Sequence, residues 1–347
     1  MRTLHRTRRV LTAVAAGSAT VTLLAACGGG SDDSGSGGSG GEGSARVAAV
    51  IKGLDNPFFQ AMEDGIDATA KDRDVEVEIQ AAQSITDTTG QADRLNTLAQ
   101  QDFGCYIVNP ISGNNLVQGL AQVARKDVPI VNIDSPVDAD AAEQAGADIA
   151  TYIGTDNTEA GGKAGDEMVE AVGSGKVAVI GGIAGDVTSG ARVDGFTQAV
   201  DGTLEVVQTV AADWERQKAL TAATDILRAN PDLKGFFAAN DDMGLGIARA
   251  VANEGRTGEV TIISVDGNQE AIEAVQAGEL HATVAQYPYA IGQMGVDACA
   301  AAAAGAELPA NVTAPTAVVT EDVAEQALEA FPAPFEEFEN PLADLAG

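Results

Sequence analysis

The side chains of this chain that could do chemistry follow directly after short apolar runs. They combine carboxylates, amides, a guanidinium group and aromatic rings, and they comprise Asn56, Phe58, Phe59, Asn109, Asp134, Arg192, Trp214, Asn240, Asp266 and Gln286. A carboxylate accepts two hydroxyl protons, an amide both donates and accepts, and a guanidinium donates through a fixed fork. Aromatic rings cover the apolar C–H face of a sugar. This set indicates recognition of a neutral polyhydroxylated molecule, such as a sugar or a polyol.

Several of these residues also have a purely structural interpretation. Asn and Asp at the end of a strand commonly cap the next helix, and we favour capping for Asp241. Phe58 and Phe59, taken alone, are typical of a core. Trp214 lies just ahead of a helical segment, where a hydrophobic staple and a ligand-stacking face both stay open.

Combinations typical of catalytic sites are missing from the sequence. His281 is the single histidine outside the N-terminal leader, and we interpret it as structural. No Ser-His-Asp or Cys-His set can be assembled without it, and no residues have metal-ligand spacing, so we expect no metal and no cofactor. The enzymatic alternative is a glycosidase that uses carboxylates alone. The glycine-rich stretch 181–190 lacks the Lys-Ser/Thr ending of a phosphate-binding loop, which favours a tight strand-to-helix turn.

The elements that must position these residues alternate between strand-like and helical patterns. Strands are predicted at 47–51, 75–79, 105–108, 130–133, 152–154, 177–180, 204–207, 235–238, 260–265 and 282–285. Helical periodicity fills most of the intervals, for example at 59–71, 89–101, 159–172 and 242–254. Apolar strands that alternate with helices predict an α/β protein whose parallel sheets are covered on both faces. Such sheets bind ligands at the carboxyl ends of their strands, where the polar set lies.

The number of strands predicts two domains. Ten or eleven strands suit two sheets better than one, and the roughly 300 residues after the N-terminal segments exceed the usual size of a single domain. The first crossing between the domains is expected around 154–157. Because no low-complexity linker marks it, we expect short strand-like hinges and mutually mobile domains.

The N-terminus has the three parts of an export signal. Four arginines occupy its first nine residues, an apolar run of about 17 residues covers 10–26, and small residues precede Cys27. The run is short for a membrane span. Leu24-Ala25-Ala26-Cys27 resembles the bacterial lipobox, which implies a signal peptide over 1–26 and lipidation of Cys27. An ordinary cleaved signal, an uncleaved anchor and twin-arginine export through Arg8-Arg9 stay open.

Composition bounds the partners of the chain. Residues 27–45 are mostly Gly and Ser with a few acidic residues, which predicts a flexible tether. The formal net charge is −31, and loss of the leader arginines would make it more negative. Such a surface repels nucleic acid and anionic lipid, so we expect no nucleic-acid partner and membrane contact only through the lipid on Cys27. We also expect a monomer.

Two cysteines remain within the α/β body. Cys105 lies in an apolar strand-like run and Cys299 in an alanine-rich helical run. A disulfide between them is compatible with an exported protein. Both positions are nevertheless typical of small core residues, and we favour two unpaired thiols.

Short motifs in a fixed order carry a resemblance to a known family. They are Leu54-Asp55-Asn56-Pro57-Phe58-Phe59, Val108-Asn109-Pro110, Ile133-Asp134, Gly181-Gly182-Ile183-Ala184-Gly185, Arg192 with Gly195-Phe196, Ala212-Asp213-Trp214, Ala239-Asn240-Asp241, Val265-Asp266-Gly267 and Ala285-Gln286-Tyr287-Pro288. Over residues 46–320 the chain resembles the ribose-binding protein family, the type I periplasmic sugar-binding proteins that serve ABC transporters.

The resemblance implies an architecture and a binding site. Two Rossmann-like lobes with parallel sheets, joined by three hinge strands, would close over a monosaccharide. The first lobe (46–155 and 287–316) would supply Asn56, Phe58, Phe59, Asn109 and Asp134; the second (156–286 and 317–347) would supply Arg192, Trp214, Asn240 and Asp266, with Gln286 at a hinge. A lipid-anchored binding protein that delivers a sugar or sugar alcohol to an ABC permease is the expected function.

Three departures from the family pattern qualify this expectation. Ser135 stands where family members that bind pentose rings typically carry Arg, and Lys52 stands where a small polar residue is usual. We expect Lys52 to enter the pocket and supply the positive charge beside Asp134. Ribose is therefore in doubt, and an open-chain polyol or a differently shaped sugar is credible. The tail after Thr320 extends beyond the usual end of the family, and we expect it to pack as a strap on the second lobe.

Other functions remain to be distinguished. A ligand module that passes a sugar signal to a membrane receptor cannot be separated from a transport protein by sequence. The effector domain of a sugar-responsive transcription regulator would share the fold, but the export signal, the acidity and the lack of a DNA-binding head exclude it.

Overall fold

The computed structural model describes residues 46–346, which lie within one compact unit. The predicted leader, Cys27 and the whole of the predicted tether fall outside the described residues. Among residues 46–346, no helix is both long and apolar enough to cross a membrane.

The first lobe is built on a six-stranded parallel sheet with the order β11-β5-β4-β3-β1-β2. Its strands are β1 (Val47–Ile51), β2 (Val77–Ala81), β3 (Cys105–Val108), β4 (Ile130–Ile133), β5 (Thr151–Thr155) and β11 (Asn311–Ala314). Every residue of β1, β3 and β4 is buried, because helices cover both faces of this sheet.

The second lobe is built on a six-stranded sheet with the order β12-β10-β9-β8-β6-β7. Its strands are β6 (Gly175–Gly181), β7 (Leu204–Ala211), β8 (Leu233–Ala238), β9 (Thr261–Asp266), β10 (Ala282–Ala285) and β12 (Ala317–Thr320). All neighbours are parallel except β12, which runs antiparallel to β10 at the edge.

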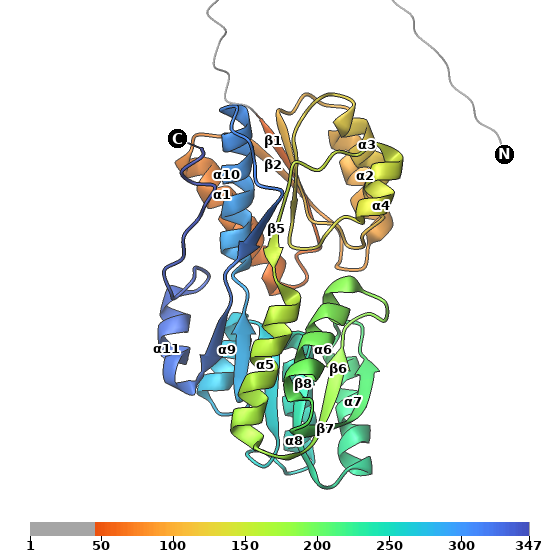
Figure 1. Ribbon diagram of the computed structural model, residues 1–347, viewed down its shortest axis with the longest axis vertical. Coiled ribbons are helices and arrows are strands. Elements are labelled where there is room, and N and C mark those ends of the chain that lie inside the picture. Colours follow the sequence, from red (N-terminus) through yellow and green to blue (C-terminus); the bar gives the residue numbers. More distant parts are fainter. Residues whose placement is uncertain (1–45, 347) are drawn as a thin grey trace, which may run out of the picture. The chain divides into compact units, whose positions relative to one another are not determined.

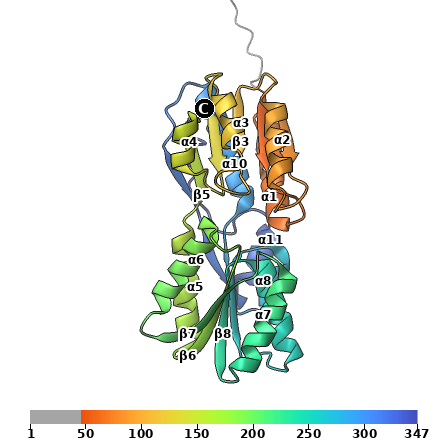
Figure 2. The same ribbon diagram turned by 90° about the vertical axis from the view of Figure 1, so that its right-hand side faces the viewer.

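Helices flank both sheets, as Figures 1 and 2 show. The first lobe holds α1 (Pro57–Asp72), α2 (Thr88–Leu98), α3 (Val117–Ala124), α4 (Ala139–Ala145) and α10 (Pro288–Ala303). The second holds α5 (Asn157–Val172), α6 (Val187–Val200), α7 (Arg216–Ala229), α8 (Asp241–Asn253), α9 (Gln269–Gln276) and α11 (Glu321–Ala330). The predicted α/β class with two lobes is confirmed.

The chain passes between the two sheets three times. It leaves the first lobe after β5, returns between β10 and α10, and leaves again between β11 and β12. Strands β11 and β12 were not predicted as strands, because Asn311 and Thr313 break the apolar pattern within β11, and Pro315 and Thr316 interrupt it between the two strands.

Cys105 and Cys299 form a disulfide, so the expectation of two unpaired thiols is wrong. Their Cα atoms lie 5.7 Å apart, and both residues are buried. The sequence pattern predicted that each cysteine is buried. It could not predict the pairing, because that depends on the packing of α10 against β3 of the first lobe. This packing brings together two residues that are 194 positions apart.

The tail also departs from expectation. Helix α11 packs against α9 of the second lobe, but the chain beyond it crosses to the first lobe, where its C-terminus lies (Figure 1). Leu342 is fully buried in the core of the first lobe, and Asn340 donates a hydrogen bond to Asp297 of α10 at 2.6 Å. A tail confined to the second lobe is therefore wrong: the tail joins both lobes.

Candidate functional site

A cavity lies between the carboxyl ends of the two sheets. Side chains of both lobes line it: Lys52, Asn56, Phe58, Phe59, Ile85, Ile111, Asp134, Ser135, Ile183, Asp186, Thr188, Arg192, Trp214, Asn240 and Asp266. Most of the residues singled out in the sequence are among them, because parallel strands bring their carboxyl ends to one edge of each sheet.

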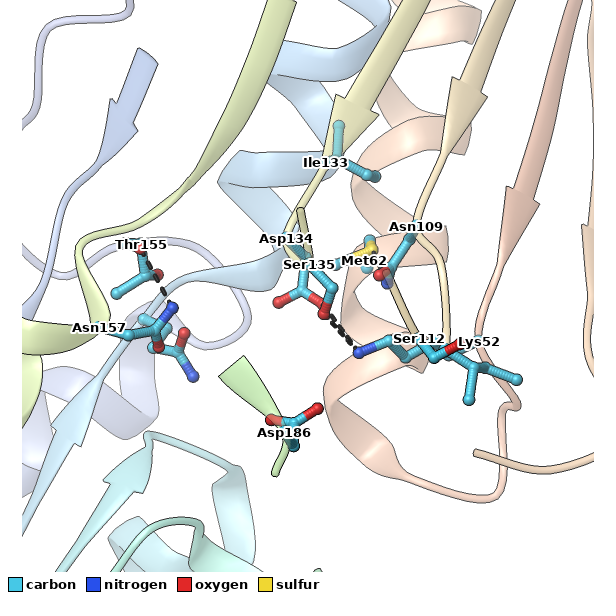
Figure 3. Close-up of polar contacts among 12 residues, drawn as sticks. Lys52, Met62, Asn109, Ser112, Ile133, Asp134, Ser135, Thr155, Asn157 and Asp186 are labelled. Atoms are coloured by element: carbon cyan, nitrogen blue, oxygen red, sulfur yellow. Dashed lines mark hydrogen bonds and ion pairs between the residues drawn. The ribbon is translucent and has the colours of Figure 1, made fainter. Parts of the chain in front are cut away.

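Lys52, Asp134 and Ser135 form a charged cluster on the wall of the first lobe. Lys52 follows β1 and reaches the two residues that follow β4. Its Nζ donates to Ser135 Oγ at 2.6 Å and lies 3.5 Å from Asp134 Oδ2, while Ser135 Oγ donates to the same carboxylate oxygen at 3.1 Å. Figure 3 shows the Lys52 ammonium directed at this pair, with Asp186 of the second lobe facing it. Lys52 thus stands beside Asp134, where the sequence led us to expect it.

Two side-chain hydrogen bonds hold the backbone of this cluster. Asp134 has φ 59°, a left-handed conformation that Asp tolerates better than most residues. Tyr152 donates its hydroxyl proton to the carbonyl of Asp134 at 2.7 Å, and Asn132 donates to the carbonyl of Ser135 at 2.8 Å. The Asp134 carboxylate is therefore fixed in place before any ligand arrives.

The start of α1 contributes aromatic rings. Asn56 Oδ1 accepts the backbone N–H of Phe58 at 2.9 Å and caps the helix, and Pro57 occupies its first position. Phe58 and Phe59 meet edge to face, with ring centroids 5.1 Å apart. Both rings line the cavity and also pack into the core of the first lobe, so the structural interpretation and the binding interpretation both apply.

Arg192 and Asp266 form a buried ion pair on the wall of the second lobe. Arg192 Nη1 donates to Asp266 Oδ1 at 3.1 Å and to the carbonyl of Ala239 at 2.7 Å. Its Nε donates to Asn157 Oδ1 at 2.8 Å, and Asn157 donates to the carbonyl of Thr155 at 3.2 Å, in the first crossing between the lobes (Figure 3). The guanidinium is thus fastened to both the site and a hinge.

Burial and charge oppose each other at Asp266. Burial raises the pKa of this carboxyl above its ordinary value, and the Arg192 guanidinium acts in the lowering direction. Gln286 Nε2 adds a second donor to Asp266 Oδ1 at 2.6 Å. Removing either partner would leave the other charge buried without compensation.

Asp241 does not cap its helix, contrary to our expectation. Asn240 is the N-cap and accepts the N–H of Met243 at 2.9 Å. The fully buried Asp241 carboxylate instead accepts the hydroxyls of Ser264 and Thr283 and, at 2.7 Å, the N–H of Asn268. It ties β9, β10 and the loop after Asp266 together. The sequence motif could not distinguish the two roles, because both place an acidic residue at the start of a helix.

A Periplasmic binding protein domain model matches residues 47–307. The chain belongs to the periplasmic binding protein family. The family expected from the sequence motifs is thereby confirmed.

Relatives of this periplasmic binding protein have named ligands. The D-allose-binding periplasmic protein of Escherichia coli (strain K12) is 38% identical over 257 residues, which cover 73% of this chain and 83% of that protein. A ribose import binding protein of Bacillus subtilis (strain 168) is 31% identical over 276 residues, covering 79% and 87%. The structure of an ABC transporter periplasmic solute binding protein from Actinobacillus succinogenes 130z with bound D-allose has a TM-score of 0.77 and 30% identity, covering 81% of this chain and 99% of that one.

Two expected site residues of this periplasmic binding protein lie behind the wall of the cavity. Asn109 is fully buried, with its Nδ2 3.4 Å from the sulfur of Met62. Gln286 is buried and reaches the cavity only through Asp266.

Sequence reasoning missed other lining residues. Ile183, Asp186 and Thr188 lie in or just after the glycine-rich loop that follows β6, and Ile85 and Ile111 follow β2 and β3. Their position after the end of a strand could have identified them. The isoleucines were missed because only polar and aromatic side chains were considered at these positions. Within residues 46–346, no cluster of His, Cys, Asp and Glu could hold a metal ion.

Proposed function

We propose that this periplasmic binding protein captures a monosaccharide or sugar alcohol between its lobes and delivers it to the membrane subunits of an ABC importer. The observation that carries the proposal is a pair of carboxylates from opposite lobes, Asp134 and Asp266, each already neutralised by its own cation. These two pairs leave little charge for an ion, and the third carboxylate of the lining, Asp186, caps helix α6. The site offers fixed acceptors and donors to hydroxyl groups, and aromatic rings to an apolar sugar face.

The same geometry favours binding over catalysis. Each carboxylate lies in an ion pair within a preformed wall, where it can orient hydroxyls without exchanging a proton. The names of the relatives, which refer to D-allose and ribose, support a sugar as cargo. Lys52 and Ser135 place an ammonium group and a hydroxyl group side by side on the first wall. The proposed ligand therefore includes aldohexoses and polyols as well as ribose.

The proposal includes an extracytoplasmic protein that is lipidated on Cys27, held by the tether over 27–45, and active as a monomer. The lipobox-like sequence supports lipidation. The Cys105–Cys299 disulfide supports an oxidising location outside the cytoplasm.

A thermal-shift panel tests the proposal. The body from residue 42 onward is melted with aldohexoses, aldopentoses, polyols and inositols. We expect at least one of these compounds to stabilise it, by about 2.7 kcal/mol at 100 times its dissociation constant. Asp266→Asn should abolish that shift, whereas Asp93→Asn, on the exposed face of α2, should keep it. A panel without any shift, or a full shift in Asp266→Asn, would overturn the proposed site. Hydrolysis of an aryl glycoside by the body would indicate an enzyme instead.

A further inference from the structure

The chain continues well past the region that matches the family. The match ends at residue 307, and β11, β12 and α11 follow it. Residues 331–346, hereafter the C-terminal strap, then run from α11 on the second lobe to the first lobe (Figure 1). The strap therefore lies beyond the matched region, and it spans the two lobes that carry the site.

At its start the strap packs on the second crossing between the lobes. The ring of Phe335 meets the ring of Tyr287 edge to face, with centroids 6.3 Å apart, and Gln326 of α11 donates to the carbonyl of Phe335 at 3.2 Å. Tyr287 has φ 65°, a left-handed conformation that disfavours a residue with a side chain. The strap thus covers a hinge residue whose backbone conformation needs support from its surroundings.

At its end the strap is anchored in the first lobe. Asn340 donates to Asp297 Oδ2 at 2.6 Å, and Arg73 of the first lobe donates to the other oxygen of that carboxylate. Leu342 is fully buried in the core of the first lobe. Just before these anchors in the chain, the half-buried Phe338 packs against the cores of both lobes.

The strap also lies directly behind the second wall of the site. Tyr287 follows Gln286, which donates to Asp266, and a small hollow under the strap is lined by Gly267, Tyr287, Phe331 and Phe335, among others. The strap therefore contacts Tyr287, the neighbour of Gln286, and lines one hollow with Gly267, the neighbour of Asp266.

We propose that the C-terminal strap is a fourth connection between the lobes, which holds them in the arrangement described here and positions Gln286 and Asp266 for the ligand. A rotation that separates the lobes would withdraw Phe338 from one of its two cores and expose apolar surface, which is unfavourable. Phe335 and Phe338 are positioning residues, because they act on the ligand only through Tyr287 and the hinge. The ligand part of this inference rests on the proposed sugar-binding function, whereas the mechanical part does not.

A distance measurement without any sugar tests the mechanical part. The body from residue 42 carries only the disulfide-bonded cysteines, so nitroxide labels can be attached at Gln100→Cys on the first lobe and Asp225→Cys on the second, both at exposed positions. Double electron–electron resonance measures the distribution of distances between the labels. Phe338→Ala should broaden this distribution and shift it to longer distances. Leu328→Ala removes a half-buried side chain that packs on the second lobe alone and should leave the distribution unchanged.

Asn340→Ala is a second strap variant, which keeps the test decisive if the Phe338→Ala protein does not fold. It removes one anchor at a half-buried position and should shift the distribution in the same direction. Circular dichroism verifies that each variant is folded. Unchanged distributions in both folded strap variants would overturn the proposal.

Titration with D-allose tests the ligand part. If D-allose binds the unaltered body, Phe338→Ala should weaken its affinity about fivefold or more through faster dissociation, and Leu328→Ala should not. Equal affinities in Phe338→Ala and the unaltered body would contradict the positioning role. Failure of D-allose to bind the unaltered body would count against D-allose as cargo, and the label distances would still decide the mechanical role.

Discussion

At the scale of residues, the site consists of two acids that are each neutralised from a different part of the chain. Lys52 reaches Asp134 from the end of β1, two strands away from β4 in the sheet, and Arg192 reaches Asp266 from helix α6. Ser135 joins the first pair as a hydrogen-bond relay. The first wall therefore presents an ammonium group and a hydroxyl to the ligand, and these two residues should decide which hydroxyl pattern fits.

Lys52→Ser should change which ligands bind without unfolding the protein. Loss of a charged donor to a ligand hydroxyl costs about 1.5–3 kcal/mol, or roughly 10- to 100-fold in affinity, for ligands that use it. Ligands that do not use Lys52 should lose far less, so the ranking of the sugar panel should change. Titration calorimetry measures this, with Lys71→Ser on the exposed face of α1 as the control. A uniform loss for every ligand, or no loss, would contradict a specificity role.

The buried carboxyl of Asp241 should make the free energy of unfolding depend on pH. Burial raises the pKa of Asp241 from 3.8 to about 6, against the lowering effect of its three hydrogen-bond donors. Because the pKa in the folded state lies above the ordinary value, the carboxyl stabilises the fold most below pH 4 and loses this contribution as the pH rises through 6. The difference in unfolding free energy between the wild type and Asp241→Asn should be larger at pH 4.5 than at pH 7, by on the order of 2 kcal/mol. Urea unfolding at the two pH values measures it, and an equal or reversed difference would contradict the assignment.

At the scale of elements, the sequence predicted what depends on local pattern. The buried strands β1, β3 and β4 are predominantly apolar runs in the sequence. The polar residues that follow them were predicted as site residues because parallel sheets bind ligands at the ends of their strands. What it missed depends on the return of the chain to each lobe. Pro315 and Thr316 interrupt the apolar pattern between β11 and β12, and the disulfide requires α10 to pack on β3. Asp241, in helix α8, was misassigned because its partners Ser264 and Thr283 lie on strands β9 and β10, which come later in the chain.

The loop after β6 and the turn before α7 form a single unit. Trp214, at φ 63°, lays its ring over Gly182, where a Cβ would overlap the indole. Gly182→Ala should therefore displace Trp214 and weaken sugar binding about tenfold, because stacking on the ring is lost. Trp214 is the single tryptophan of the chain, so its fluorescence reports the displacement directly. Gly190→Ala has no neighbour near the added Cβ and is the matched control. An unchanged emission spectrum and affinity in Gly182→Ala would contradict the stacking role.

At the scale of the whole molecule, the proposed lipidation of Cys27 would keep the binding protein close to the membrane subunits of its importer. Lipidation of Cys27 should place the protein in the membrane fraction of cells that produce the full chain. Cys27→Ser should lower the share of the protein in the membrane fraction and raise the share in the soluble extracytoplasmic fraction or the medium, because without the thiol no lipid can be attached at this position. Ser31→Ala in the predicted tether is the control. Fractionation followed by immunodetection measures the shift, and an unchanged membrane fraction in Cys27→Ser would contradict lipidation.

The central claim is that one sugar is held simultaneously by both lobes. A crystal structure of the body with the compound that gives the largest thermal shift tests it most directly. The account predicts sugar hydroxyls within hydrogen-bond distance of the carboxylates of both Asp134 and Asp266, with an apolar face of the sugar against an aromatic ring of the cavity. A sugar that contacts only one of these carboxylates, or that binds outside the cavity between the lobes, would contradict it.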